Sequence, residues 1–212
     1  MKITKALVTK AKNKQIWDLG NQTLYDLCEK HPAHTGDEVI TAKIWLIGRA
    51  YAAAIERRKS KNGFKGDAYY IKRVVPKIKK SDIDELLSSL DNIARVDLEN
   101  IDKVLRVHYE VVRLFKNISG DKSRKRSLAS KYLHFHKPQL FFIYDSKAKK
   151  ALGKLKGITK KSSPSKLKAD DEYSKFCEKC MKVRDHIISS KHCKSLTPRE
   201  LGCGLNRRAI NV

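Results

Sequence analysis

The sequence has no run approaching ~20 consecutive apolar residues, the length that a membrane-spanning helix needs. Its N-terminal segment is mixed in character and lacks the apolar block of a signal peptide, so we expect no export. The cysteines form an odd set without the density of a secreted disulfide scaffold: Cys28, Cys177, Cys180, Cys193 and Cys203. These absences argue against a membrane protein or a disulfide-rich secreted domain, and we expect a cytoplasmic location.

Acidic residues are scarce relative to basic ones. The 23 Asp and Glu stand against 47 Lys and Arg, which gives a formal net charge of +24. A charge of this size predicts a polyanionic partner, and we expect double-stranded DNA that carries a modified base. Apolar residues still make up 41% of the chain, so it should fold around a core of its own. We expect no cofactor, no metal, no membrane contact and no obligate protein partner.

Strand-like alternation of apolar and polar residues is missing, and so is any internal repeat. Helical spacing recurs instead, which predicts an all-α fold. The length fits a single helical domain over 1–212, or two lobes of about residues 1–118 and 119–212 with a DNA-binding cleft between them. The expected helices are a broken one over 14–30 and continuous ones over about 37–58, 81–93, 97–115, 126–136, from 146, and 170–190.

Capping residues predict where three of these helices begin. Asp37 and Asp145 each precede a helical pattern and can accept hydrogen bonds from its first N–H groups. Ser81 and Asp84 have the spacing of a capping box. The tail from Lys191 carries only a weak pattern, and no helix is predicted there.

The segment from Gly120 to Ala151 carries the features most suggestive of chemistry. It opens with a basic, glycine-led entry to a helix, where backbone N–H groups and cations can hold a phosphate. It continues through the apolar run 140–144, which delivers one carboxylate, Asp145, to a helix start amid lysines. The segment therefore predicts a phosphate-binding helix next to an isolated acid.

The stretch KPQLFFIYD, Lys137 to Asp145, resembles the run that precedes the catalytic aspartate in 8-oxoguanine DNA glycosylases of the helix-hairpin-helix family. An alignment anchored there puts Lys125 near their catalytic lysine. Together with WLIGRAYAAAIERR, Trp45 to Arg58, the stretch also resembles bacterial anti-phage glycosylases that act on modified cytosines. The resemblance implies a compact multi-helix domain whose hairpin, ISGDK at 118–122, is degenerate relative to the family's LPGVG and is followed by an apolar run one residue longer.

The resemblance implies a base-flipping enzyme that excises a modified base and leaves an abasic site. Asp145 would stabilise positive charge developing on the sugar and activate water. Lys125 would attack as a neutral amine only in a bifunctional enzyme, and we expect a monofunctional one, with phosphate contact as the commoner role for this lysine. The candidate substrate-binding residues are Arg49, Tyr51, Glu56, Arg57 and Tyr144, and the candidate DNA-binding residues are Gly120, Lys122, Arg124, Arg126, Lys131 and Lys147.

Other interpretations stay open. Asp145 can be a helix cap alone, and the chain a non-catalytic nucleic-acid-binding protein. Cys177 and Cys180 have zinc-ligand spacing but fit no common zinc module, and they fall within a predicted helix. The aromatic residues of the basic stretch 57–80 suit either base stacking or core packing, the commoner fate: Phe64, Tyr69 and Tyr70. A metal-dependent nuclease is the least favoured, because no suitable carboxylate cluster is present.

Overall fold

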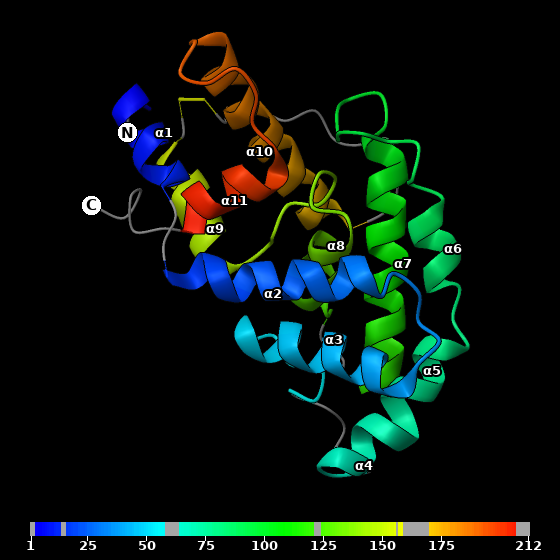
Figure 1. The fold of residues 1–212 in the computed structure, drawn as a ribbon. Helices are drawn as coiled ribbons and strands as arrows, with labels where there is room; N and C mark the ends of the chain where they lie inside the picture. The colour runs from blue at the N-terminus through cyan, green and yellow to red at the C-terminus, as the bar shows by residue number, and fades with distance from the viewer. Residues whose placement is uncertain are drawn as a thin grey trace.

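A computed structural model of the chain describes residues 3–13, 16–57, 64–120, 124–155, 157–158 and 170–206 (Figure 1). The described residues contain helices and no strand, which confirms the predicted all-α fold. None of the described helices is long and apolar enough to cross a membrane. In chain order they are α1 (Lys5–Lys12), α2 (Ile16–Lys30), α3 (Asp37–Ala50), α4 (Asp67–Tyr69), the π-helix η1 (Tyr70–Val74), α5 (Val75–Lys79), α6 (Ile83–Ser88), α7 (Ile101–Ser119), α8 (Arg126–His136), α9 (Ser146–Lys154), α10 (Asp171–Ser189) and α11 (Pro198–Asn206).

The long helix α7 passes through the core. Apolar residues recur along it at helical spacing, and those at 104, 105, 111, 112 and 115 are almost completely buried. Gly120 ends the helix in the left-handed region, with φ of 64°, where a residue with a side chain would be strained. The chain then turns back into α8, which packs against α7, α3 and α2.

Two predictions about the N-terminal helices were wrong. Helix α2 is continuous through Gly20, where the sequence predicted a break. Helix α3 ends at Ala50 instead of near residue 58, because Ala52 takes a φ of 50° and turns the chain away. The turn packs tightly on the helix: a side chain on Gly48 would meet the Cα of Ala54 at 3.0 Å. The turn over 51–57 therefore projects from the end of α3 as a separate feature.

The capping predictions had mixed outcomes. Asp145 caps α9 as predicted, and α8 has the predicted bounds. Gly36, and not Asp37, occupies the N-cap position of α3. Ser81 does not cap α6, because its hydroxyl donates to the carbonyl of Ile78, and Asp84 bonds to His34 instead.

The boundaries of the remaining helices also differ from the sequence prediction. Helix α6 ends at Ser88, and 97–100 form a turn held by Asp97 before α7 begins. Helix α10 runs one residue short of the predicted bounds at each end. The tail contains α11, which its weak pattern did not predict.

The two ends of the described chain meet. Helix α11 packs against α1 and α9, and Figure 1 shows α1 and α11 on the same side of the molecule. The ring Nε2 of His192 lies 3.2 Å from the carbonyl oxygen of Ile3. Residues far apart in sequence thus support α9, the helix that Asp145 caps.

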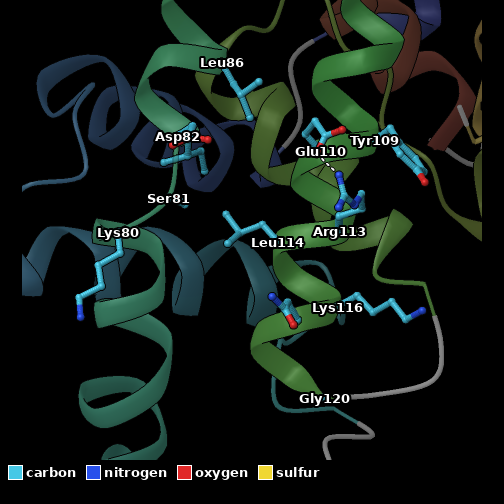
Figure 2. A pocket seen from close by; sticks show the side chains of 12 residues that line it. Lys80, Ser81, Asp82, Leu86, Tyr109, Glu110, Arg113, Leu114, Lys116 and Gly120 are labelled. Atoms are coloured by element: carbon cyan, nitrogen blue, oxygen red, sulfur yellow. Dashed lines mark hydrogen bonds and ion pairs between the residues drawn. The ribbon is translucent and has the colours of Figure 1, made fainter.

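A groove of about 840 Å³ runs along α7 opposite the start of α6 (Figure 2). Leucines 86 and 114 lie on its apolar part, while Arg113 and Glu110 form a 2.8 Å ion pair on its rim. Gly120, a predicted phosphate contact, lines this groove. Asp145 does not line it, so the groove and the carboxylate are separate features of the surface.

Candidate active site

Asp145 follows an apolar run that α8 and α10 hold in place. The hydroxyl of Ser130 accepts a 3.0 Å hydrogen bond from the backbone N–H of Tyr144. The hydroxyl of Tyr173 donates to the carbonyl of Phe142 at 2.9 Å. The side chains of the run are buried, so the run has little freedom to shift. Its last residue is consequently placed at a fixed point beside α8.

The carboxylate of Asp145 is half-buried and caps α9. Its Oδ1 accepts a 2.8 Å hydrogen bond from the N–H of Ala148, in the first turn of the helix. This is the geometry of an ordinary N-cap, and the positive end of the helix dipole favours the ionised acid there. Within the described part of the chain, Oδ2 accepts no hydrogen bond. One oxygen is thus occupied and the other is available.

Lys131 of α8 lies within electrostatic range of Asp145. The lysine is only 3% exposed, and its Nζ donates to the hydroxyl of Ser127 at 2.9 Å and to the carbonyl of Tyr51 at 3.2 Å. Burial lowers the pKa of Lys131, and the negative charge of Asp145 offsets part of that decrease. The carbonyl that it contacts terminates α3, where the helix dipole is negative. A desolvated amine and a carboxylate therefore interact electrostatically here, without forming an ion pair.

Lys125 has a different environment from the one its alignment with a catalytic lysine predicts. It is 8% exposed, immediately precedes α8, and its Nζ donates to the carbonyl of Arg57 at 2.5 Å. Lys125, at the N-cap of α8, and Lys131, within α8, therefore each donate to a carbonyl of the turn 51–57. The electrostatic environment of Lys131 includes Asp145.

The predicted substrate-binding residues of the turn are largely bonded to one another or to their neighbours. Glu56 accepts from Arg49 at 2.5 Å and from the hydroxyl of Tyr70 at 2.5 Å. Arg57 donates to the carbonyl of Ala52 at 2.8 Å, within the turn itself. These contacts fix the turn against η1. Arg49 still has an exposed side chain, whereas both oxygens of Glu56 are occupied.

Tyr51 joins the turn to α2 and to α8. Its hydroxyl donates to the side chain of Asn21 at 2.7 Å, and the ammonium of Lys131 lies 5.6 Å from its ring centre. Tyr144, the other aromatic candidate, donates its hydroxyl to Glu172. The two tyrosines thus belong to different contact networks.

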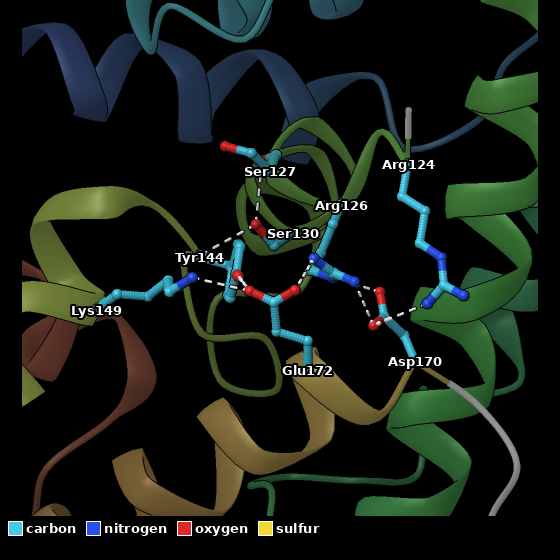
Figure 3. A network of polar contacts seen from close by, with 8 residues as sticks. All are labelled: Arg124, Arg126, Ser127, Ser130, Tyr144, Lys149, Asp170 and Glu172. Carbon is cyan, nitrogen blue, oxygen red and sulfur yellow. Dashed lines mark hydrogen bonds and ion pairs between the residues drawn. The ribbon is translucent and has the colours of Figure 1, made fainter. Parts of the chain in front are cut away.

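Arg126 and two acids form the densest ionic network of the region (Figure 3). Its guanidinium binds Asp170 through Nε at 2.5 Å and Nη2 at 2.7 Å, and it binds Glu172 through Nη1 at 2.6 Å. Burial raises the pKa of Asp170, but the hydrogen bonds from Arg126 outweigh it and hold the pKa below its usual value. The ammonium of Lys149 also belongs to the network and forms a 2.8 Å ion pair with the carboxylate of Glu172. Much of the positive charge of Arg126 is therefore neutralised within the protein.

The family of the chain follows from a comparison with family models. The model of the HI_0787_N N-terminal domain matches residues 2–140, about two thirds of the chain. The chain belongs to the HI_0787_N family. The part that matches the HI_0787_N model contains the turn 51–57 and the two lysines that hold it, and it ends before Asp145. The chain matches no curated protein and no solved structure.

The remaining predicted DNA contacts differ in their availability. Arg124 and Lys147 have exposed side chains, although Arg124 lies 3.5 Å from Asp170. Lys122 lies outside the described residues. Of the predicted set, Lys147 on the first turn of α9 is the exposed cation nearest in sequence to Asp145.

A second polar cluster on α8 was not predicted from the sequence. The ring of His34 is buried and bonds to Asp84 through Nδ1 and to the hydroxyl of Tyr132, 2.7 Å away, through Nε2. Burial lowers the pKa of His34, which keeps the ring neutral. These residues are separated by 50 and 98 positions, so no local pattern could have revealed the cluster. It ties the start of α6 to the middle of α8.

The cysteines and aromatics of the alternative predictions lie in the core. Cys177 and Cys180 are completely buried in α10, and burial raises the pKa of both thiols. The described residues contain no group of three or more His, Cys, Asp or Glu side chains that could hold a metal ion. Tyr69 and Tyr70 are also buried, whereas Phe64 is 44% exposed beneath the ammonium of Lys72. Of the two alternatives for these tyrosines, the structure shows core packing, the one that the sequence favoured.

Proposed function

We propose that the protein is a DNA glycosylase that removes a modified base and leaves an abasic site. The net charge of +24 supports a polyanionic partner, and the Asp145 segment carries the resemblance to helix-hairpin-helix glycosylases. The observation that carries the proposal is the electrostatic interaction between the buried amine of Lys131 and the half-buried carboxylate of Asp145, which caps α9. Neither Lys131 nor Asp145 lines the groove along α7 or the other described pocket.

Asp145 would act on the sugar of an extruded nucleotide. As the bond between C1′ and the base nitrogen breaks, the base leaves with the bonding electrons and the sugar develops positive charge. The unbonded Oδ2 of Asp145 would stabilise that charge and take a proton from the water that attacks C1′. The N-terminus of α9 keeps the carboxylate ionised before the reaction and holds it through Oδ1.

Lys131 is a second candidate for the role that the sequence alignment gave to Lys125. In a monofunctional enzyme the charge of Lys131 would orient Asp145. In a bifunctional enzyme its amine would attack C1′ directly and form an imine after ring opening, which borohydride reduces to a stable covalent bond. The lowered pKa of Lys131 favours the neutral amine that such an attack needs.

The test compares alkali-induced strand breaks in plain DNA, phage DNA with modified cytosines, and a duplex with 8-oxoguanine. We expect breaks in a modified substrate only, and we expect their loss in Asp145→Asn with binding unchanged. Asp171→Asn is the matched control, because Asp171 is an exposed acid in the first turn of α10. Full activity of Asp145→Asn would remove this residue from the mechanism.

Borohydride trapping then decides the role of the lysines. A covalent adduct that is retained in Lys125→Met and lost in Lys131→Met identifies Lys131 as the nucleophile. Strand breaks without an adduct in any protein indicate the monofunctional reaction. An adduct lost only in Lys125→Met would restore the assignment made from the sequence.

A second candidate function is non-catalytic DNA binding. The hydrogen bond from Ala148 to Asp145 favours it, because a helix cap alone accounts for an acid at this position. The carbonyl contacts of both lysines are likewise compatible with a purely structural role. This protein would bind DNA with strong salt dependence and give no breaks in any substrate.

A further inference from the structure

Both tryptophans of the chain lie at the surface. Trp17 is 77% exposed and Trp45 is 44% exposed, although the core contains many smaller apolar and aromatic side chains. Tryptophan is on average among the more buried residues, because its large apolar surface is costly to hydrate. A sequence selected for folding alone would have little reason to expose both. Their exposure indicates a ligand with a flat, apolar face.

Trp17 lies in an apolar tip at the start of α2. Its neighbours Ile16 and Leu19 are 85% and 77% exposed. The seventeen residues up to and including Trp17 contain five lysines and no acid. The chain thus presents large apolar side chains directly after a strongly basic segment. Basic charge together with an exposed aromatic ring is the combination that binds unpaired nucleotides.

Trp45 lies on α3 next to an arginine. The guanidinium carbon of Arg49, one turn further along the helix, is 5.8 Å from the centre of the Trp45 ring. Planar guanidinium groups and aromatic rings are both surfaces on which bases stack. The pair belongs to the end of α3 from which the turn 51–57 projects.

The two tryptophan sites belong to one side of the candidate active site. Helices α2 and α3 pack against each other, and Figure 1 shows them side by side. The hydroxyl of Tyr51 bonds to Asn21 near the start of α2, while its carbonyl bonds to Lys131. Tyr51 thus connects the start of α2 and the end of α3 to Lys131.

We propose that Trp17 and the Trp45 and Arg49 pair stack on unpaired bases next to the site of base excision. The inference rests on the proposed function for its partner, DNA, and adds the binding of single-stranded or locally opened segments. Bases are favoured over a second copy of the chain, because two copies that each carry a charge of +24 repel one another. Self-association and membrane binding are outcomes of the test.

The test uses the intrinsic fluorescence of two single-tryptophan proteins. Trp45→Phe leaves only Trp17, and Trp17→Phe leaves only Trp45. We expect unmodified oligothymidylate to quench the emission of both proteins, because a base stacked on an indole ring quenches it. Neither variant alters the buried core, so both proteins should remain folded.

Alanine variants measure the contribution of stacking to affinity. Trp17→Ala should weaken binding of oligothymidylate about 5- to 100-fold, the range expected for the loss of one stacked base. The slope of log affinity against log salt should stay unchanged, because no phosphate contact is removed. Leu98→Ala is the matched control, since Leu98 is also 78% exposed, and it should bind like the wild type.

Three results would overturn the inference. One is unchanged emission of both single-tryptophan proteins at saturating oligothymidylate, together with unchanged affinity of Trp17→Ala. Another is a Trp17 emission shift that depends on protein concentration without DNA, which would assign the tip to self-association. The third is a shift with anionic phospholipid vesicles and none with oligothymidylate. The fluorescence assay needs no excision, so quenching by oligothymidylate together with no strand breaks in any modified substrate would support base stacking while refuting the glycosylase.

Discussion

Asp145 and Asp170 both precede a helix, yet they are used in opposite ways. Asp170 is 2% exposed, and Arg126 occupies both of its oxygens. Asp145 is half-buried and gives one oxygen to a backbone N–H, while a buried lysine lies nearby. The first carboxylate is neutralised by a guanidinium and holds two helices together. The second keeps an oxygen that a substrate can reach.

This difference separates structural acids from chemically useful ones more clearly than position in the sequence does. Both acids have the local pattern of a helix start. Only the partners distinguish them: Arg126 of α8 binds Asp170, whereas the N–H of Ala148 in α9 bonds to Asp145. A carboxylate bonded in a bidentate manner to arginine is satisfied, whereas one with a single backbone bond retains capacity to accept a proton or stabilise a cation.

The largest expected effect comes from Asp170. Asp170→Ala should reduce the free energy of unfolding by about 3 kcal/mol, because it leaves the guanidinium of Arg126 without its main partner in a largely buried position. Urea denaturation measures the change. The control is Glu110→Ala, which breaks an exposed pair with Arg113 and should cost less than about 0.5 kcal/mol. Equal losses in the two variants would show that the Asp170 network adds nothing to stability.

Asp145 should contribute less to stability. Asp145→Ala should lose about 1 kcal/mol, the usual contribution of a helix cap, whereas Asp145→Asn should change stability little because asparagine caps equally well. The same denaturation experiment tests both. If Asp145→Ala proved as damaging as Asp170→Ala, the contrast between the two acids would disappear.

The smallest effect concerns Glu172, which shares the network of Asp170 at the surface. Hydrogen bonds from Lys149 and Tyr144 lower the pKa of Glu172 from 4.5 to about 2. A lowered pKa means that the ionised acid stabilises the folded state above pH 4.5, and that this contribution is lost as the pH falls toward about 2. The stability difference between wild type and Glu172→Gln should therefore shrink across this interval. A difference that is constant with pH would contradict the ion pair.

Local features of the fold could be predicted from the sequence, and contacts across it could not. The bounds of α8 and the cap at Asp145 were predicted correctly, because helical periodicity and capping act within a few residues. The end of α3 was missed because the left-handed residue that turns the chain is Ala52 and not a glycine, and the glycine that allows the close approach of Ala54 is Gly48, inside the helix.

The candidate site shows the same limit. The sequence indicated an acid amid lysines but could not say which lysine approaches it. Lys125 aligned with a catalytic residue, yet its amine binds the carbonyl of Arg57, 68 positions away. The exposure of the two tryptophans could not be predicted either, because it depends on which helix faces pack together.

The meeting of α1 and α11 has a consequence for synthesis. Because α11 packs on α1 and α9, the support of the helix that Asp145 caps is complete only when residues 198–206 have left the ribosome. The long helix α7 and the turn held by the α8 lysines can form earlier, since domains acquire structure progressively as they emerge. A nascent chain would therefore carry basic surface before it carries a finished site, and any excision activity would begin only after α11 has emerged.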